Sequence, residues 1–216
     1  MPCRAGTHTV VPKNKNQSTV KYNAKQKCFY KGKQRCRGLT KILKHVHTWR
    51  PPRIKGVKYT NTCKTKMRGW TAGKALDTAV TAIINAKTPT GPKWAQQLAK
   101  KVVLKLRDMG FISMKSQIPV ALKYCSVATA VDIVAKKRTQ TVLFELKYCS
   151  QPLAVMKKTY TKRARGASSL CEIHSTQLKA TKQMYLHTYQ IAKSAVSTYI
   201  ILACQDSKIW IMQKFL

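Results

Sequence analysis

The pattern of apolar positions changes near residue 69 and divides the chain into two parts. Beyond that point, apolar residues recur every three or four positions along 70–86 and again along 93–109. This spacing predicts two helices that each bury one face, because it places the apolar side chains on one side of a helix. The sequence TPTGP at 88–92 separates the two helices, and Gly110 is typical of a residue that ends the second.

Further along the chain, β-branched and alternating residues predict strands. We expect strands over 117–124, 128–134, 141–149, 196–204 and 208–215. A basic loop over 151–173 and a helix over 175–193 lie between the third and fourth of these strands. Two helices, three strands, a helix and two strands predict one α/β (or α+β) domain over 69–216, built on a mixed sheet.

Before residue 69 the apolar pattern is weak. Residues 1–68 contain few apolar runs, so they would not bury enough apolar surface to offset the entropy lost on ordering. We therefore expect a basic arm over 1–68 that is largely disordered when free and lies on nucleic acid. The stretch 39–49 has helical spacing, which predicts one short helix that ends before Pro51.

The charge distribution follows the same division. The chain has 42 Lys and Arg against 6 Asp and Glu, for a net charge of +36. Asp77 is the first acidic residue, so residues 1–76 carry 20 basic residues and no acid. Such a charge favours a nucleic acid backbone as partner over a membrane surface or an acidic substrate. No stretch reaches about 18 apolar residues, and the N-terminus lacks the apolar segment of a secretory signal, so we expect an intracellular protein with no membrane span.

The cysteine and histidine positions bear on the redox state and on zinc. Eight cysteines are scattered along the chain, which favours reduced thiols over a disulfide framework. The arm contains three cysteines and two histidines, at Cys28, Cys36, His45, His47 and Cys63. Their spacing is irregular, whereas zinc sites use short regular spacings, so zinc remains the less favoured alternative.

Two acidic residues interrupt strands that are otherwise apolar, namely Asp132 and Glu145. If the hairpin turns between Arg138 and Thr139, they stand opposite each other with Cβ atoms about 4.5–5.5 Å apart. Two carboxylates that close repel unless a cation lies between them, and Mg²⁺ or Mn²⁺ is the natural occupant. Lys147 shares the strand face of Glu145 and could orient a water or stabilise charge on a phosphate. The alternative is a solvated polar edge of the sheet.

Asp132, followed after twelve residues by Glu145-Leu146-Lys147, resembles the core of the PD-(D/E)XK nuclease superfamily. The order of helix, three-stranded meander, helix and further strands is also similar. The similarity covers roughly residues 70–205 and is greatest to RecB-like and phage-exonuclease-like members, particularly those of large DNA viruses. The resemblance implies a restriction-endonuclease-like fold, a mixed central sheet flanked by helices. It also implies metal-dependent hydrolysis of DNA in processing, repair or recombination, in the nucleus or virion of a DNA virus.

The resemblance also implies roles for the strand residues. Asp132, Glu145 and the Leu146 carbonyl would hold Mg²⁺ or Mn²⁺, which lowers the pKa of an attacking water. Lys147 would orient that water and offset negative charge as the bond breaks.

On the helices, the resemblance implies a glutamine that helps to hold the substrate or the water. Gln177 is preferred over Gln183 for this role. Asp77, four residues after Gly73, is a candidate third metal contact. The alternative for each of these positions is an exposed helical residue without a role.

The basic loop lies between the predicted catalytic strands and the Gln177 helix. Its five cations, placed to grip phosphates that flank the site, are Lys157, Lys158, Lys162, Arg163 and Arg165. Nothing in the sequence is suited to reading bases, so we expect little sequence specificity. A non-enzymatic DNA-condensing protein, such as a virion core component that keeps a nuclease-like fold, is the alternative function, and cleavage of RNA is a third. Exonuclease against endonuclease action and the oligomeric state stay open.

Overall fold

The computed structural model describes residues 20–23, 26, 28–53, 55, 69–122 and 126–214. Within these ranges the chain is a mixed α/β protein, which confirms the predicted fold class. The strands are β1 (Val20–Asn23), β2 (Cys28–Lys31), β3 (Gln34–Gly38), β4 (Ser113–Ala121), β5 (Val127–Lys137), β6 (Gln140–Cys149), β7 (Val196–Cys204) and β8 (Ile209–Lys214). The helices are α1 (Leu39–Val46), α2 (Gly69–Ile84), α3 (Lys93–Asp108), α4 (Leu153–Thr159) and α5 (Leu170–Tyr189), with a short 3-10 turn at Lys193–Ala195.

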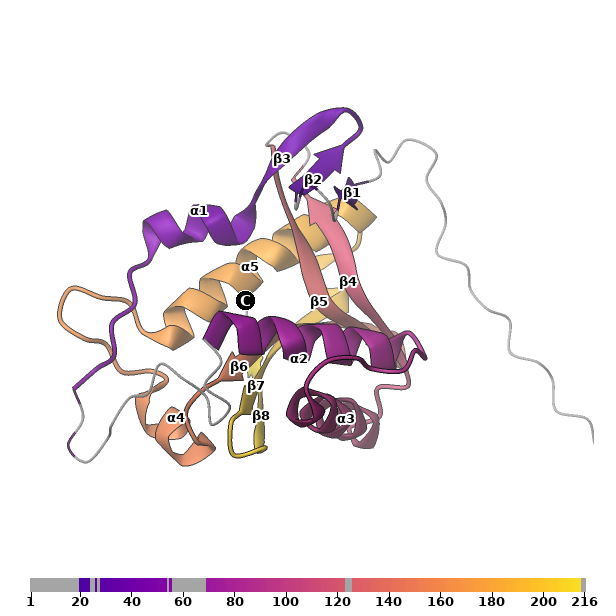
Figure 1. Cartoon of the computed structure of the whole chain (residues 1–216). Coiled ribbons are helices and arrows are strands. Elements are labelled where there is room, and N and C mark those ends of the chain that lie inside the picture. The colour runs from indigo at the N-terminus through magenta and orange to yellow at the C-terminus, as the bar shows by residue number, and fades with distance from the viewer. Residues whose placement is uncertain are drawn as a thin grey trace, which may run out of the picture.

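The strands form one mixed sheet in the order β1-β2-β3-β5-β6-β7-β8, with β4 paired to β5 (Figure 1). The strands β4, β5 and β6 are an antiparallel meander, β7 lies parallel to β6, and β8 closes the edge antiparallel to β7. Lys137 faces Gln140 and Ile133 faces Phe144, so the predicted hairpin register is confirmed over this part of the meander.

Helices cover both faces of the sheet, and β6 shows why its sequence is almost continuously apolar. Phe144 packs into the core beneath α2 and α3, while Leu143 packs into a second core with α5. Neighbouring residues of a strand point to opposite faces, so a strand covered on both sides needs apolar residues at nearly every position. An acid within such a strand is therefore costly unless it has a specific partner.

The structure differs from the expectation for part of the predicted disordered arm. The described part of this region, residues 20–55 with gaps, is called here the N-terminal segment. It forms a three-stranded meander whose last strand pairs with β5 in parallel, with Arg37 opposite Val127. Leu39 at the start of α1 is 5% exposed and packs into the α5 core. The short helix predicted at 39–49 is confirmed as α1, while the prediction for residues 1–19 and 56–68 falls outside the described residues.

Two local predictions need correction between β6 and α5. The predicted loop over 151–173 contains α4, whose first turn is capped because Leu153 N–H donates to the Asp206 carboxylate at 3.2 Å. Helix α5 begins at Leu170, earlier than the predicted residue 175. Ser169 and Glu172 form a capping box there, and their Ser-x-x-Glu spacing is the signal that marks this start. None of the helices in the described ranges is long and apolar enough to cross a membrane.

Candidate active site

Gln117 on β4, Asp132 on β5 and Glu145 on β6 lie at adjacent positions across the meander. On β4 and β5, Ser116 faces Ile133 and Ile118 faces Val131, which puts Gln117 at the level of Asp132. Extending the β5–β6 register by one position puts Glu145 at the same level. The described ladders pair neither Gln117 nor Asp132, and Gln117 has a φ of +53°. Such a backbone conformation is uncommon for residues other than glycine and is enriched at functional sites.

The β5–β6 ladder ends at the pair Ile133 and Phe144, and the two strands separate beyond it. We call this point the strand fork, and it is formed by Asp132 on β5 and residues 145–147 on β6. Beyond the fork, β3 takes the edge of β5 that β6 has left, pairing at Val127 and Ala128. The Leu146 N–H, which would otherwise lose its acceptor, donates to Asp132 Oδ2 at 2.8 Å. The Asp132 side chain therefore replaces the backbone acceptor that β5 no longer supplies at this position, and it is held facing β6.

Glu145, Lys147 and Gln177 form a connected group at the fork. Glu145 is 1% exposed, and its Oε1 accepts hydrogen bonds from Lys147 Nζ and from Gln177 Nε2. Lys147 Nζ also donates to Gln177 Oε1 at 3.2 Å. Helix α5 thus supplies Gln177 to the site, whereas Gln183, six residues further along, is exposed.

Asp77 reaches the same region from α2. Its Oδ1 accepts a hydrogen bond from Gln117 Nε2 at 2.8 Å. Burial raises the pKa of Asp77 to about 6, with the Glu145 charge adding to the rise and the Gln117 hydrogen bond and Lys147 opposing it. Both helical layers therefore contribute to the fork. Nothing in the sequence distinguished Gln117, whose role depends on its unusual backbone conformation.

Three acidic side chains and one ammonium lie close together at the site. Burial, and then the nearby Glu145, raise the pKa of Asp132 well above its ordinary value. Burial alone would lower the pKa of Lys147, but the carboxylates of Glu145, Asp132 and Asp77 outweigh it and raise that pKa. One ammonium does not fully compensate three acids, so their ionisation is disfavoured, and a divalent cation with oxygen ligands would favour it.

The carboxylates fit a hard metal ion by chemistry, but their present contacts are with the protein. In the described ranges no three His, Cys, Asp or Glu side chains converge closely enough to hold an ion as they stand. At the fork, Lys147 and Gln177 bind Glu145, and the Leu146 N–H binds Asp132. The Leu146 side chain lies in the core, and a metal-binding role for its carbonyl remains a prediction.

The zinc alternative concerns the cysteines and histidines of the arm. Of its five candidate ligands Cys63 lies outside the described residues, and the other four form no metal-binding group in the part of the chain that the structure describes. His47 Nδ1 instead lies 2.9 Å from the Ser168 hydroxyl. The cysteines that the structure describes as free thiols are Cys28, Cys36, Cys149, Cys171 and Cys204.

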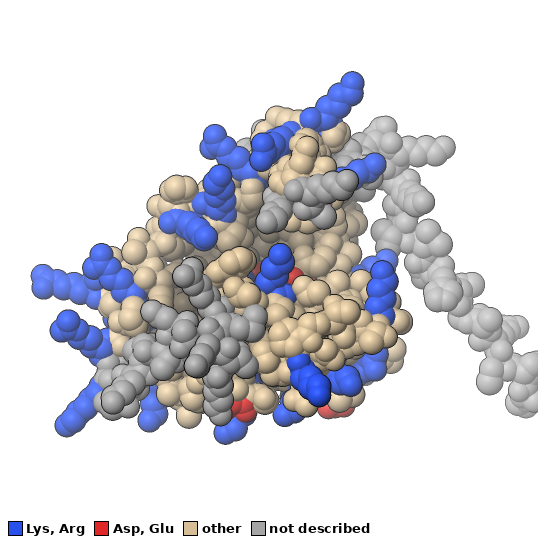
Figure 2. All heavy atoms as spheres, viewed as in Figure 1, with Lys and Arg blue, Asp and Glu red and all other residues tan. Residues whose placement is uncertain are grey.

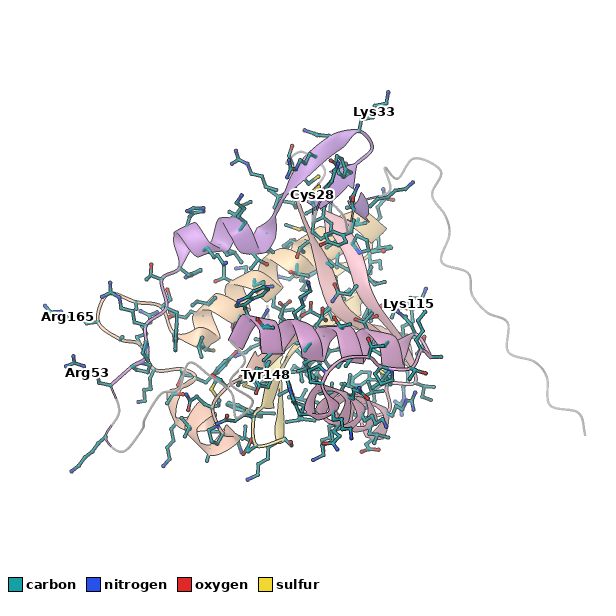
Figure 3. The ribbon with its side chains drawn as sticks, viewed as in Figure 1. Cys28, Lys33, Arg53, Lys115, Tyr148 and Arg165 are labelled. Atoms are coloured by element: carbon teal, nitrogen blue, oxygen red, sulfur yellow. The ribbon has the colours of Figure 1, made fainter. Side chains whose placement is uncertain are left out.

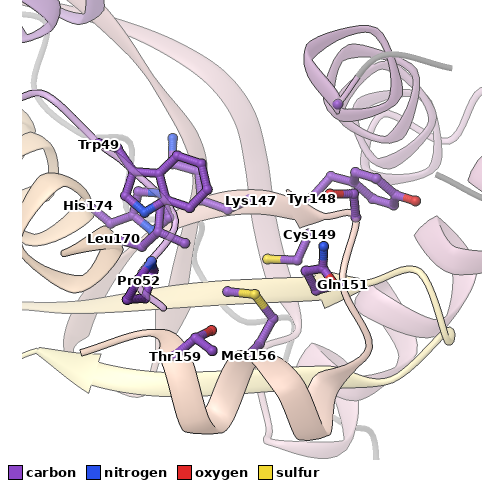
Figure 4. A pocket seen from close by; sticks show the side chains of 12 residues that line it. Trp49, Pro52, Lys147, Tyr148, Cys149, Gln151, Met156, Thr159, Leu170 and His174 are labelled. Carbon is purple, nitrogen blue, oxygen red and sulfur yellow. The ribbon is translucent and has the colours of Figure 1, made fainter. Parts of the chain in front are cut away.

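A pocket of about 260 Å³ opens beside Lys147 (Figure 4). His174, one helical turn before Gln177, is part of its wall and lies 3.2 Å (Nδ1) from the Tyr160 hydroxyl. Burial, and then the charge of Lys147, lower the pKa of His174 to about 3, so the imidazole is neutral at physiological pH. The sequence signal for His174 was its three-residue spacing from Gln177, since such residues share a helix face.

The predicted phosphate-binding cations are exposed but not equivalent. Lys157 and Lys158 lie in the last turn of α4, and Lys162 and Arg165 follow in the loop. Arg163 differs, because its guanidinium forms an ion pair with Glu172 of the α5 capping box. Arg165 lies at the same edge of the molecule as Arg53 of the N-terminal segment (Figure 3).

Basic side chains are numerous on the face of the molecule seen in Figure 2. Figure 2 shows Lys and Arg side chains around much of the edge of this face, a few Asp or Glu atoms near its middle beside one basic side chain, and further acidic atoms at its lower edge. An anionic chain crossing the face would therefore meet cations on both sides of the acidic centre. No model of a known protein family matches this chain, and no curated protein sequence matches it either.

Proposed function

We propose that this protein is a metal-dependent nuclease that hydrolyses phosphodiester bonds of DNA with little sequence specificity. The observation that carries the proposal is the convergence of Asp132, Glu145, Lys147 and Gln177 at the strand fork, with Asp77 nearby. Half of the six acidic residues of a chain with a net charge of +36 thus meet in one place. Carboxylates repel phosphates, so a protein that only binds DNA gains nothing from burying three of them together.

The carboxylates of Asp132, Glu145 and Asp77, with the Leu146 carbonyl, are the groups that would hold the ion. Bound Mg²⁺ would supply Lewis acidity and a lowered pKa for an attacking water. Lys147 donates a hydrogen bond to Glu145 in the structure, and with Glu145 holding the ion its ammonium would be free to face the phosphate.

Lys147 keeps its proton because the carboxylates raise its pKa. It is therefore suited to orient a water and to offset charge that develops on the phosphate, and not to act as a base. Gln177 binds both Glu145 and Lys147 through its amide, so we assign it as a positioning residue. These roles act on the phosphate backbone, which carries no sequence information, so we expect low sequence specificity.

The test is cleavage of linear and circular DNA by the purified full chain, with Mg²⁺ or with chelator. We expect Mg²⁺-dependent strand breaks that fall by at least about 100-fold in Glu145→Gln and in Lys147→Met. Asp108→Asn is the matched control, since Asp108 is an exposed acid at the end of α3. Circular substrates separate endonuclease from exonuclease action, and RNA assayed alongside tests the choice of nucleic acid.

The competing function is DNA binding or condensation without cleavage. It draws support from the exposed cations, which would bind DNA whether or not the fork is active. Tight, salt-sensitive binding without Mg²⁺-dependent cleavage would favour this alternative and refute the nuclease. Cleavage unchanged by Glu145→Gln would show that it does not come from the strand fork and would refute the proposed site.

A further inference from the structure

The pocket beside Lys147 is assembled from segments that are far apart in the sequence. The residues that line it include Trp49, Pro52, Lys147, Met156, Leu170 and His174. The N-terminal segment, the start of α2, the end of β6, α4 and α5 all contribute. Lys147 belongs to both the pocket and the strand fork, so a group in the pocket lies directly beside the proposed site of cleavage.

Trp49 is held at this pocket by contacts with the chain that precedes α5. Ser168 N–H donates to the Thr48 carbonyl at 2.9 Å, and Trp49 forms a β-bridge with Ser168. The 2.9 Å contact between His47 Nδ1 and the Ser168 hydroxyl adds a further tie. Ser168 directly precedes the N-cap of the helix that carries His174 and Gln177. The backbone at Trp49 is thus held relative to the site, and the side chain of this residue, which is 37% exposed, lines the pocket (Figure 4).

The lining suits a flat, uncharged ligand better than a phosphate. Among the described lining residues Lys147 alone is charged, and its ammonium is bound to Glu145 and Gln177. His174 is neutral, as shown above, and Met156, Leu170 and Pro52 are apolar. An aromatic ring, an apolar floor and a neutral imidazole together provide stacking and hydrogen bonding, which are the interactions that proteins use for unpaired bases.

We propose that this pocket binds an unpaired nucleobase of the nucleotide next to the phosphodiester at the fork, with the base stacked on Trp49. The inference rests on the proposed nuclease function, since it names the form of DNA that the site takes. A base enters such a pocket only when it is not paired in a duplex. The preferred substrate is therefore a single strand or a frayed DNA end.

The test measures binding of labelled single-stranded oligonucleotides in chelator, where no cleavage competes. Trp49→Ala should weaken binding about 5- to 150-fold, the range for loss of one stacked base, and Trp49→Phe should restore most of it. Trp70→Ala is the matched control, because Trp70 is 72% exposed but is not among the lining residues, and we expect less than a twofold change. A thermal unfolding curve checks that each variant is folded.

A second arm identifies the base itself. A single abasic residue is moved along the oligonucleotide, and each version is measured with wild type and with Trp49→Ala. At one position the abasic residue should weaken wild-type binding and leave the Trp49→Ala variant unaffected, because the base and the indole are then lost from the same contact. Equal losses for the two proteins at every position would overturn the proposal.

This experiment separates the two proposals. Trp49-dependent base binding in a protein that shows no Mg²⁺-dependent cleavage would keep the pocket and refute the nuclease. Cleavage that depends on Glu145, with no coupling between Trp49 and any base, would keep the nuclease and refute the pocket. In active protein, we also expect blunt duplex ends to be cut more slowly than ends with an unpaired overhang, and Trp49→Ala to reduce that difference.

Discussion

Replacing Asp77 by asparagine should stabilise the metal-free protein, although Asp77 lies in the proposed active site. The substitution keeps the shape of the side chain and an oxygen that can accept the Gln117 hydrogen bond. It removes a carboxylate that burial and the Glu145 charge make unfavourable in its ionised form. The sign of the effect, stabilisation on losing an acid, is opposite to that expected for an acid in a favourable ion pair.

The magnitude follows from the pKa of Asp77, which is about 6 in the folded protein against an ordinary value of 3.8. At about 1.36 kcal/mol for each pKa unit, the difference corresponds to about 3 kcal/mol. Since the folded state holds its proton to higher pH than the unfolded state, wild type loses this stability as the pH rises from about 3.8 through 6. The gain from Asp77→Asn should thus be small at pH 3.5 and reach up to about 3 kcal/mol at pH 8.

Urea unfolding in chelator at several pH values measures this gain as the difference between wild type and variant. Asp108→Asn is the control, an exposed acid for which we expect less than about 0.5 kcal/mol at every pH. With Mg²⁺ present, the gain should shrink, because the ion then uses the carboxylate that the variant lacks. A variant that is less stable than wild type at pH 8, or a gain that does not change with pH, would refute the electrostatic reasoning.

Three further measurements test other parts of the structure. Ser169→Ala removes the capping box of α5, and we expect urea unfolding to show a loss of about 0.5–2 kcal/mol. Replacing both Lys157 and Lys158 by alanine should weaken the salt dependence of DNA binding. If both contact phosphates, the plot of log binding constant against log salt concentration should become shallower by up to about 1.8. Arg163→Ala should change that slope less, because the guanidinium is already paired with an acid. Mg²⁺ at 100 times its Kd should raise the free energy of unfolding by about 2.7 kcal/mol, and Glu145→Gln should abolish most of this rise.

Each of these has an outcome that contradicts it. Unchanged stability in Ser169→Ala would show that α5 is held by its packing alone. A slope that changes more for Arg163→Ala than for the lysine pair would show that the ion pair opens on DNA. An Mg²⁺ effect that survives in Glu145→Gln would place the ion elsewhere than at the strand fork.

The sequence predicted most of the fold because the signals beyond residue 69 are local. Helices α2 and α3 follow from apolar periodicity, and the apolar runs of β5, β6 and β7 follow from burial on both faces of the sheet. The hairpin register could be predicted from the turn alone, since a single turn position fixes every pair in the β5–β6 ladder.

The N-terminal segment shows where local reasoning stops. Its strands contain few apolar residues, and Cys36 and Leu39 are buried against cores that the rest of the chain provides. A segment that uses an existing core needs few apolar residues of its own, so composition alone underestimates its order. The sequence indicates Trp49 as an apolar position of the stretch 39–49 and as an aromatic residue of the basic arm that could stack on bases. It does not show the partner Ser168, which lies more than a hundred residues away.

The candidate site contains some residues that the sequence reveals and others that only the structure reveals. Asp132, Glu145 and Lys147 could be found because charged residues are conspicuous within apolar strands. Gln117 could not be found, because its position depends on a positive φ that no residue type signals there. His174 was visible only through its spacing from Gln177, and its neutral state follows from burial that the sequence does not show.

The contact between the N-terminal segment and the chain before α5 also bears on the order of folding. His47 and Ser168 are 121 positions apart, so this contact closes a very long loop, which is slow to form and costly in chain entropy. During synthesis the N-terminal segment leaves the ribosome early, but its partner strand β5 follows much later and Ser168 later still. We expect the β4–β8 core to fold first and the indole to dock last. The basic residues of the nascent chain would thus be exposed before the pocket lined by Trp49 is complete. The proposed nuclease activity would appear only when folding is finished.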